Sequence, residues 1–140
     1  MASHASTTIG ISGSVYEMLA KSLVAALNAE RLKTSAVPLT WVLHPLSKAA
    51  LQHARWMAQN GQCSHGIGTT EFTTRMNASN ITHPRGENVA STVHTQVHEV
   101  VVQWMGSQGH HDNIIRPDFT QIGVGVAVGS FFTYWCTIFH

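Results

Sequence analysis

Near its C-terminal end, the 140-residue chain contains the sequence Ile122-Gly123-Val124-Gly125-Val126-Ala127-Val128. Bulky and minimal side chains alternate here with a period of two, which predicts a β-strand with one bulky face and one nearly bare face. A bare face lets another backbone or a helix approach closely. The next apolar stretch, residues 131–139, predicts a second strand. Gly129-Ser130 between them suits a two-residue hairpin turn.

Helical patterns precede this hairpin. Ser14-Val15-Tyr16-Glu17 resembles a capping box at the start of a first helix. Pro45 suits the first turn of a second helix, and Asn60-Gly61 suits its left-handed end. A third helix would be capped by Ser91 or Thr92, with Val93 and Trp104 among its inward residues. Residues 62–90 predict a long, functional loop with a short helix near 70–76.

Helices first and a hairpin last predict an α+β domain in which helices pack on a mainly antiparallel sheet. A length of 140 residues with 44% hydrophobic and 11% charged residues suits one folded domain. We expect a flexible segment at residues 1–13 and a single domain at 14–140. The large aromatic residues of the second strand are expected in the sheet core; they are Phe131, Phe132, Tyr134, Trp135 and Phe139.

The overall charge of +1 gives no sign of a nucleic-acid partner. No apolar run reaches the ~18 residues that a transmembrane span needs. The first residues lack a signal-peptide pattern, so either a leader has been removed or the protein is intracellular. The sequence is compatible with a monomer or a dimer.

Covalent modifications have several candidate residues. Cys63 and Cys136 allow one disulfide, which would close a loop of roughly 70 residues and contribute about 4 kcal/mol. The alternative is two free thiols. Asn77-Ala78-Ser79 and Asn80-Ile81-Thr82 both match the N-glycosylation pattern of secreted proteins.

The ten histidines are numerous beside seven acidic residues and suggest metal or pH-sensitive chemistry. Three candidates lie in segments expected to be loops or helix ends: His65, Glu87 and His110. Two imidazoles and a carboxylate form a ligand set that Zn²⁺ uses when one position stays open. The alternative is three unrelated polar residues on the surface.

The order of several motifs resembles the CAP superfamily (the SCP/PR-1-like, or SCP/TAPS, domain), and its microbial members most closely. The matching segments are Leu27-Asn28-Ala29-Glu30-Arg31, Pro38-Leu39-Thr40-Trp41, Ala49-Ala50-Leu51-Gln52-His53-Ala54, Gly86-Glu87-Asn88-Val89-Ala90, Trp104-Met105-Gly106-Ser107-Gln108-Gly109-His110, Ile122-Gly123-Val124-Gly125 and Tyr134-Trp135. The resemblance implies an α-β-α sandwich with a cleft over the sheet.

The resemblance also implies which residues line that cleft. His65, Glu87 and His110 match three of the family's two His and two Glu, whereas the fourth position falls at Ser107. Ser107 is expected on the same helical face as Trp104, pointing at the cleft without a carboxylate. Any Zn²⁺ would then have three protein ligands and would be lost below about pH 6.5. Asn88 and His111 are expected around these ligands.

Proteins similar to this one are secreted and are linked to sterol or fatty-acid binding and to host–microbe or defence processes. We therefore expect a binding protein rather than an enzyme. One alternative is a metal-dependent hydrolase or protease that uses the same cleft. Another is an extracellular protein-interaction module, with the long loop as the surface that contacts a partner or receptor.

Overall fold

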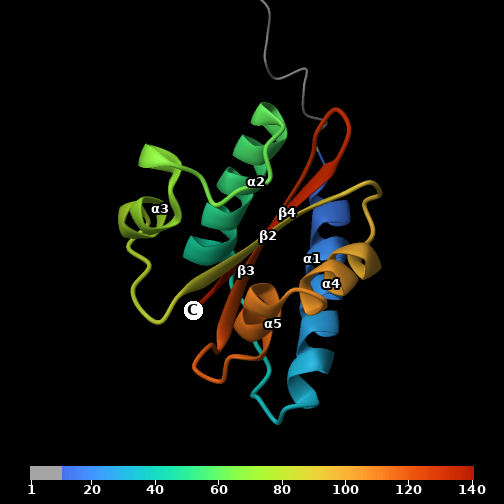
Figure 1. Ribbon diagram of the computed structural model, residues 1–140, viewed down its shortest axis with the longest axis vertical. Helices are drawn as coiled ribbons and strands as arrows, with labels where there is room; N and C mark the ends of the chain where they lie inside the picture. The colour runs from blue at the N-terminus through green and yellow to red at the C-terminus, as the bar shows by residue number, and fades with distance from the viewer. Residues whose placement is uncertain (1–10) are drawn as a thin grey trace, which may run out of the picture.

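The computed structural model describes residues 11–140, in which five α-helices and a four-stranded sheet form three layers (Figure 1). The sheet order is β1 (Thr40–Trp41), β3 (Gln121–Val128), β4 (Thr133–Phe139), β2 (Gly86–Thr92). β1 runs parallel to β3, and the other neighbours are antiparallel. Helices cover both faces, so the predicted α-β-α sandwich is confirmed. No helix in this part of the chain is long and apolar enough to cross a membrane.

The bare face of β3 is the contact surface for α2 (Lys48–Asn60) and for the turn η2 (Leu43–Ser47) that leads into it. A Cβ atom at Gly123 would overlap the backbone of Leu46, and one at Gly125 would overlap the carbonyl group of Ala50. The contact is therefore made between two backbones. This confirms the close approach predicted from the alternation of glycine and valine.

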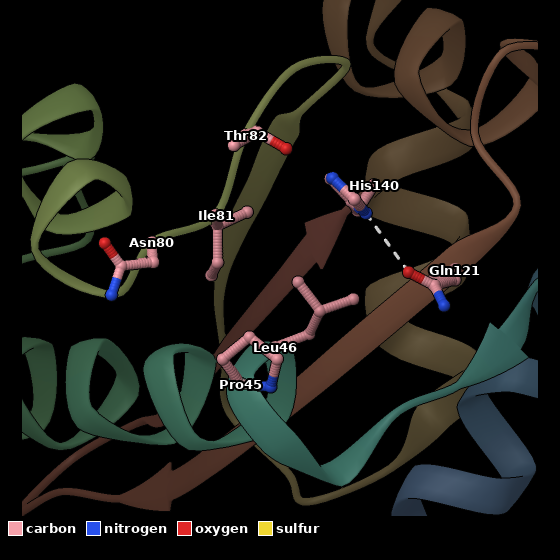
Figure 2. Close-up of a pocket in the computed structure, with 7 residues that line it drawn as sticks. All are labelled: Pro45, Leu46, Asn80, Ile81, Thr82, Gln121 and His140. Atoms are coloured by element: carbon pink, nitrogen blue, oxygen red, sulfur yellow. Dashed lines mark hydrogen bonds between the residues drawn. The ribbon is translucent and has the colours of Figure 1, made fainter.

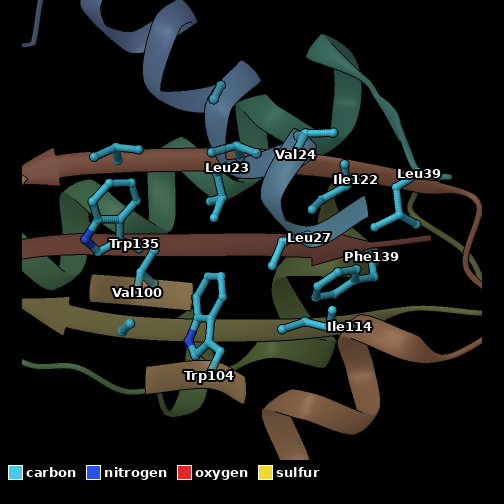
Figure 3. Close-up of a cluster of buried hydrophobic side chains, with 14 of the residues drawn as sticks. Leu23, Val24, Leu27, Leu39, Val100, Trp104, Ile114, Ile122, Trp135 and Phe139 are labelled. Atoms are coloured by element: carbon cyan, nitrogen blue, oxygen red, sulfur yellow. The ribbon is translucent and has the colours of Figure 1, made fainter. Parts of the chain in front are cut away.

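The opposite face carries the larger side chains. Here α1 (Gly13–Leu32) and α4 (Val97–Met105) pack on the sheet, with α5 (Gln108–Ile115) beside them (Figures 1 and 3). Leu23 and Leu27 of α1 and Trp104 of α4 belong to the same buried cluster (Figure 3). On the α2 face the helix contributes mainly small residues and Met57, namely Ala49, Ala50, Ala54, Met57 and Ala58.

Arg31 joins the end of α1 to the segment around the end of α5. Its fully buried guanidinium donates hydrogen bonds of 2.7–2.9 Å to the carbonyl groups of Val37, Ile114, Arg116 and Phe119. Each of these acceptors is a backbone oxygen, so the positive charge is shared among dipoles rather than paired with one carboxylate. The contact fixes where α5 lies, and α5 carries His110.

Residues 86–92 correct the sequence prediction. They form β2, which pairs with β4 along its whole length, from Gly86 opposite Phe139 to Thr92 opposite Thr133. Ser91 and Thr92 therefore do not cap a helix, and α4 begins only at Val97 after the N-cap residue Gln96. Pairing with β4 satisfies the backbone of this polar segment and outweighs its local preference for turns and caps.

Smaller corrections concern the ends of elements. Ser12 rather than Ser14 caps α1, since its side chain accepts a hydrogen bond from the amide of Val15. The β3–β4 connection spans residues 129–132, and it leaves Phe131 85% exposed and Phe132 43% exposed instead of in the core.

The predicted short helix is confirmed as α3 (Phe72–Ala78), and α2 ends as predicted at a left-handed Gly61. Most of the predicted flexible segment, residues 1–10, lies outside the described residues.

The two cysteines are free thiols, so the disulfide considered from the sequence is wrong for this structure. Cys136 is buried in β4 and donates to Oε2 of Glu87 at 3.4 Å, whereas Cys63 is exposed beyond the end of α2. Burial, and then the negative charge of Glu87, raise the pKa of the Cys136 thiol well above its usual value. This thiol is therefore held in its protonated form.

The backbone contact at Gly125 can be tested by one methyl group. We expect Gly125→Ala to lower the free energy of unfolding by about 2–3 kcal/mol, because the new Cβ forces α2 away from the sheet. The control is Gly109→Ala in α5, where a Cβ meets nothing; it should be neutral or stabilising by up to about 1 kcal/mol. Urea denaturation measures both. Equal stabilities for the two variants would contradict the proposed contact.

Candidate functional site

Glu87 is the centre of a polar cluster on the α2 side of the sheet. Its side chain is only 1% exposed. Oε1 accepts hydrogen bonds from Nδ1 of His65 and Nη2 of Arg75, both at 2.8 Å. Oε2 accepts from Nη1 of Arg75 at 2.7 Å and from Sγ of Cys136. Four donors therefore surround the two carboxylate oxygens, which is the full complement such a group can accept.

Arg75 is the residue that the sequence reasoning missed. It projects from α3, whose first turn is capped by the carboxylate of Glu71. Besides its two bonds to Glu87, Arg75 donates to the carbonyl groups of Thr70 and His65. One guanidinium thus ties the loop carrying His65, and α3 itself, to β2. An arginine within the predicted short helix, in the same long loop as Glu87, was the available signal.

The electrostatics of Glu87 reflect two opposing effects. Burial by itself raises the pKa of the carboxyl group, because a charged group loses hydration. The hydrogen bonds from His65 and Arg75, together with the positive charge of Arg75, outweigh this and hold the pKa below its ordinary value. Glu87 is therefore ionised at neutral pH and forms a bidentate ion pair with Arg75.

His110 lies in the first turn of α5, a helix that packs against β2. Its Nδ1 lies 2.9 Å from Oγ of Ser107, and its ring stacks on Trp104 with centroids 6.3 Å apart. Burial, and then the charge of His65, lower the pKa of His110. The imidazole is therefore neutral at pH 7. Ser107 is not on the helix of Trp104, as the sequence suggested, because α4 ends at Met105 and Ser107 is the N-cap of α5.

Two amide side chains hold α5 against β2. Asn88, which is fully buried, donates to the carbonyl group of His110 at 3.0 Å. Asn113 donates to Oδ1 of Asn88 at 2.9 Å and to the carbonyl group of Glu87 at 3.3 Å. His111 lies on the same turn, with its Nδ1 3.7 Å from Oδ1 of Asp112. Asn88 and Asn113 thus set the position of His110 relative to Glu87.

The cluster brings His65 into direct contact with Glu87, whereas His110 bonds to Ser107. Within residues 11–140, no three His, Cys, Asp or Glu side chains form a group arranged to hold a metal ion. The oxygens of Glu87 are already occupied by Arg75 and His65. Glu87 therefore orients the imidazole of His65 and has no free oxygen left for a cation, unlike the ligand role expected for it from the sequence.

A separate pocket of about 190 Å³ lies near the end of the chain (Figure 2). Its lining includes Leu46, Ile81, Asn80 and His140, whose Nδ1 donates to Oε1 of Gln121. The volume is below the ~300–1,000 Å³ that is typical of pockets for drug-sized ligands.

Both predicted glycosylation residues, Asn77 and Asn80, are exposed at the end of α3.

A family model described as the cysteine-rich secretory protein family, CAP, matches residues 24–139. The chain belongs to the CAP family. The uncharacterized protein YkwD of Bacillus subtilis (strain 168) is 37% identical over 130 residues, which are 91% of this chain. The chain spans 49% of the length of that relative.

Several solved structures share the fold. An outer surface protein of Borrelia burgdorferi superposes with a TM-score of 0.80 at 20% identity, over 94% of this chain and 95% of its own. An extracellular SCP-domain protein of Bacillus anthracis gives 0.74 at 22% identity, over 93% of this chain and 44% of its own. The protein NaASP2, solved with Zn²⁺, gives a TM-score of 0.66 at 12% identity, over 88% of this chain and 79% of its own. The two bacterial proteins are thus described as outer surface or extracellular.

The buried ion pair generates a stability prediction. Glu87→Gln keeps the shape of the side chain but leaves Arg75 without its counter-charge. We therefore expect the free energy of unfolding to fall by about 3 kcal/mol. Because the folded-state pKa of Glu87 lies below the unfolded value, its contribution is present above pH ~4.5 and is lost as the pH falls further. Urea denaturation from neutral to acidic pH should therefore show the gap between wild type and variant closing.

The matched control for this ion pair is Glu99→Gln. Glu99 also bonds to a histidine, His94, but lies on the surface near the start of α4. Glu99→Gln should lower the free energy of unfolding much less than Glu87→Gln does at neutral pH. A Glu87→Gln variant as stable as the Glu99→Gln variant would show that the buried pair does not hold α3 and the His65 loop to the sheet.

Proposed function

We propose that this chain is a secreted, non-catalytic CAP binding domain that binds a divalent cation, Zn²⁺ above others, between His65 and His110. The observation that carries the proposal is the pair of oriented imidazoles. Nδ1 of His65 bonds to Glu87 and Nδ1 of His110 bonds to Ser107. In both rings Nε2 is the nitrogen left for a ligand, and a carboxylate behind an imidazole increases its basicity.

The protonation state of His110 favours a cation here. Burial, and then the charge of His65, lower the pKa of His110, so its imidazole is a neutral donor at physiological pH. With two imidazoles and the remaining positions open to water, affinity should be lower than that of a closed structural site. The solved structure of NaASP2 with Zn²⁺ supports cation binding by this fold.

The remaining parts of the proposal rest on the family. The bacterial neighbours described as extracellular or outer surface proteins support secretion. Family membership supports a sterol or fatty-acid ligand and a role in host–microbe or defence processes. The Ser107–His110 pair gives little support to a hydrolase, because a nucleophilic serine needs a histidine that is oriented by an acid. Glu87, the candidate acid, bonds to His65 and Arg75 instead.

A calorimetric Zn²⁺ titration tests the cation site. At about pH 7.5 we expect saturable binding of one equivalent, abolished in the His65→Ala/His110→Ala double variant. Binding should weaken strongly at about pH 5.5, because protons compete for imidazoles whose ordinary pKa is near 6.5. His98→Ala, which removes an exposed histidine of α4, is the control and should bind as wild type does. Binding that survives the double variant would place the cation elsewhere.

A further inference from the structure

His53 is a buried histidine of α2 that touches the loop carrying His65. It is 1% exposed, and its ring stacks on Trp56 with centroids 5.3 Å apart. Its Nε2 atom lies 2.7 Å from the carbonyl oxygen of Ser64. Because a carbonyl oxygen can only accept, Nε2 carries the hydrogen atom and donates it. A side chain of α2 is thus bonded to the residue directly before His65.

The other ring nitrogen of His53 shows what this histidine contributes. Nδ1 is buried and has no hydrogen-bond partner among residues 11–140. Burial lowers the pKa of His53, so the ring is neutral at pH 7 and Nδ1 is an unpaired acceptor. An unpaired buried acceptor lowers stability. A leucine would avoid that loss but could not donate to Ser64, so the bond to Ser64 is the specific contribution of the imidazole.

A second donor holds the next carbonyl group of the same loop. Nη2 of Arg75, from α3, donates to the carbonyl oxygen of His65 at 2.9 Å. The loop is also closely packed, because the amide of Gly66 donates to Oγ of Ser64, and a Cβ atom at Gly66 would overlap the carbonyl group of Thr70. The segment around His65 is therefore bonded to both α2 and α3.

These two bonds act on the two peptide planes that meet at the Cα atom of His65. The carbonyl group of Ser64 and the amide nitrogen of His65 share one rigid plane, and the carbonyl group of His65 belongs to the next plane. Fixing both planes fixes φ and ψ of His65, and with them the direction of its Cα–Cβ bond. The side chain itself is 52% exposed, so packing does little to direct it. The bond from Nδ1 to Glu87 then sets the rotation of the ring.

We infer that His53 is a positioning residue for His65 and acts through the carbonyl group of Ser64. Together with Arg75, it directs the His65 imidazole so that Nδ1 meets Glu87 and Nε2 is left for a ligand. Removing a group that orients a metal-binding histidine typically lowers affinity about 10–100-fold. The inference deepens the proposed function and rests on it for the bound cation, whereas the orientation of His65 is measurable without a cation.

Three variants separate positioning from packing. His53→Leu keeps a side chain of similar size and removes the donor, and His53→Gln keeps an N–H donor at a similar reach. Val24→Ala is the control for lost stability, because Val24 is buried in the core on the opposite face of the sheet and its truncation leaves a cavity there. Urea denaturation gives the stability of each variant, so that lost binding can be compared with lost folding.

The first measurement is the tautomer of His65 in the metal-free chain. It is read from the ¹⁵N shifts of the imidazole nitrogens at about pH 8, above the ordinary pKa of an imidazole. We expect the hydrogen atom on Nδ1 in wild type, His53→Gln and Val24→Ala. His53→Leu should show a mixture of both tautomers, because His65 no longer stays on Glu87. An unchanged tautomer in His53→Leu, or the same mixture in Val24→Ala, would overturn the inference.

The second measurement is the Zn²⁺ titration. We expect His53→Leu to weaken binding about tenfold or more, His53→Gln to recover most of the affinity, and Val24→Ala to bind as wild type does. An equal loss in Val24→Ala would contradict positioning by His53, as would a His53→Gln variant that binds no better than His53→Leu. Absence of Zn²⁺ binding by the wild type would overturn the cation proposal alone, and the tautomer of His65 would then decide the role of His53.

Discussion

The contact between the backbone of α2 and the glycine face of β3 is the constraint on which the rest of the structure depends. Gly123 and Gly125 let the helix lie directly on the strand, at Leu46 and Ala50. Four of the six buried residues of α2 are accordingly alanines, and the other two are His53 and Met57. The large apolar side chains pack on the opposite face, against α1 and α4. One pattern of side-chain size thus divides the protein into two unequal cores.

β2 is an edge strand of the sheet, and the charged cluster forms around its buried Glu87. Burying the carboxylate of Glu87 without partners would cost several kcal/mol. Arg75, His65 and Cys136 supply those partners. The long segment between α2 and β2 is held by these directional bonds and by the burial of Met76 and Ile81 in the α2-side core. Ionisation of Glu87 therefore contributes one part of what fixes this segment on the sheet.

Local sequence patterns correctly predicted the elements that have strong periodicity. They failed for elements whose secondary structure is determined by tertiary contacts. The alternation of residues 122–128 and the Asn60-Gly61 helix end were confirmed because both follow from side-chain size and backbone geometry within a few residues. β2 was missed because Gly86-Glu87-Asn88-Val89-Ala90-Ser91-Thr92 is polar and turn-forming by composition, and only its pairing with β4 makes it a strand. The contact of Arg75 with Glu87, 12 residues apart, likewise depends on the folded loop.

β2, which carries Glu87, and β1 lie at opposite edges of one sheet, and this arrangement argues against strong coupling between the two edges. β3 and β4 separate β1 from β2 and are joined to both by continuous hydrogen bonding. Coupling needs an element with two arrangements that both ligands favour differently. The central strands are buried on both faces, and α2 is fixed on β3 by direct backbone contact. A cation at His65 and His110 would therefore act on the loop that carries His65 and on α5, which carries His110, and not on α2 or β3.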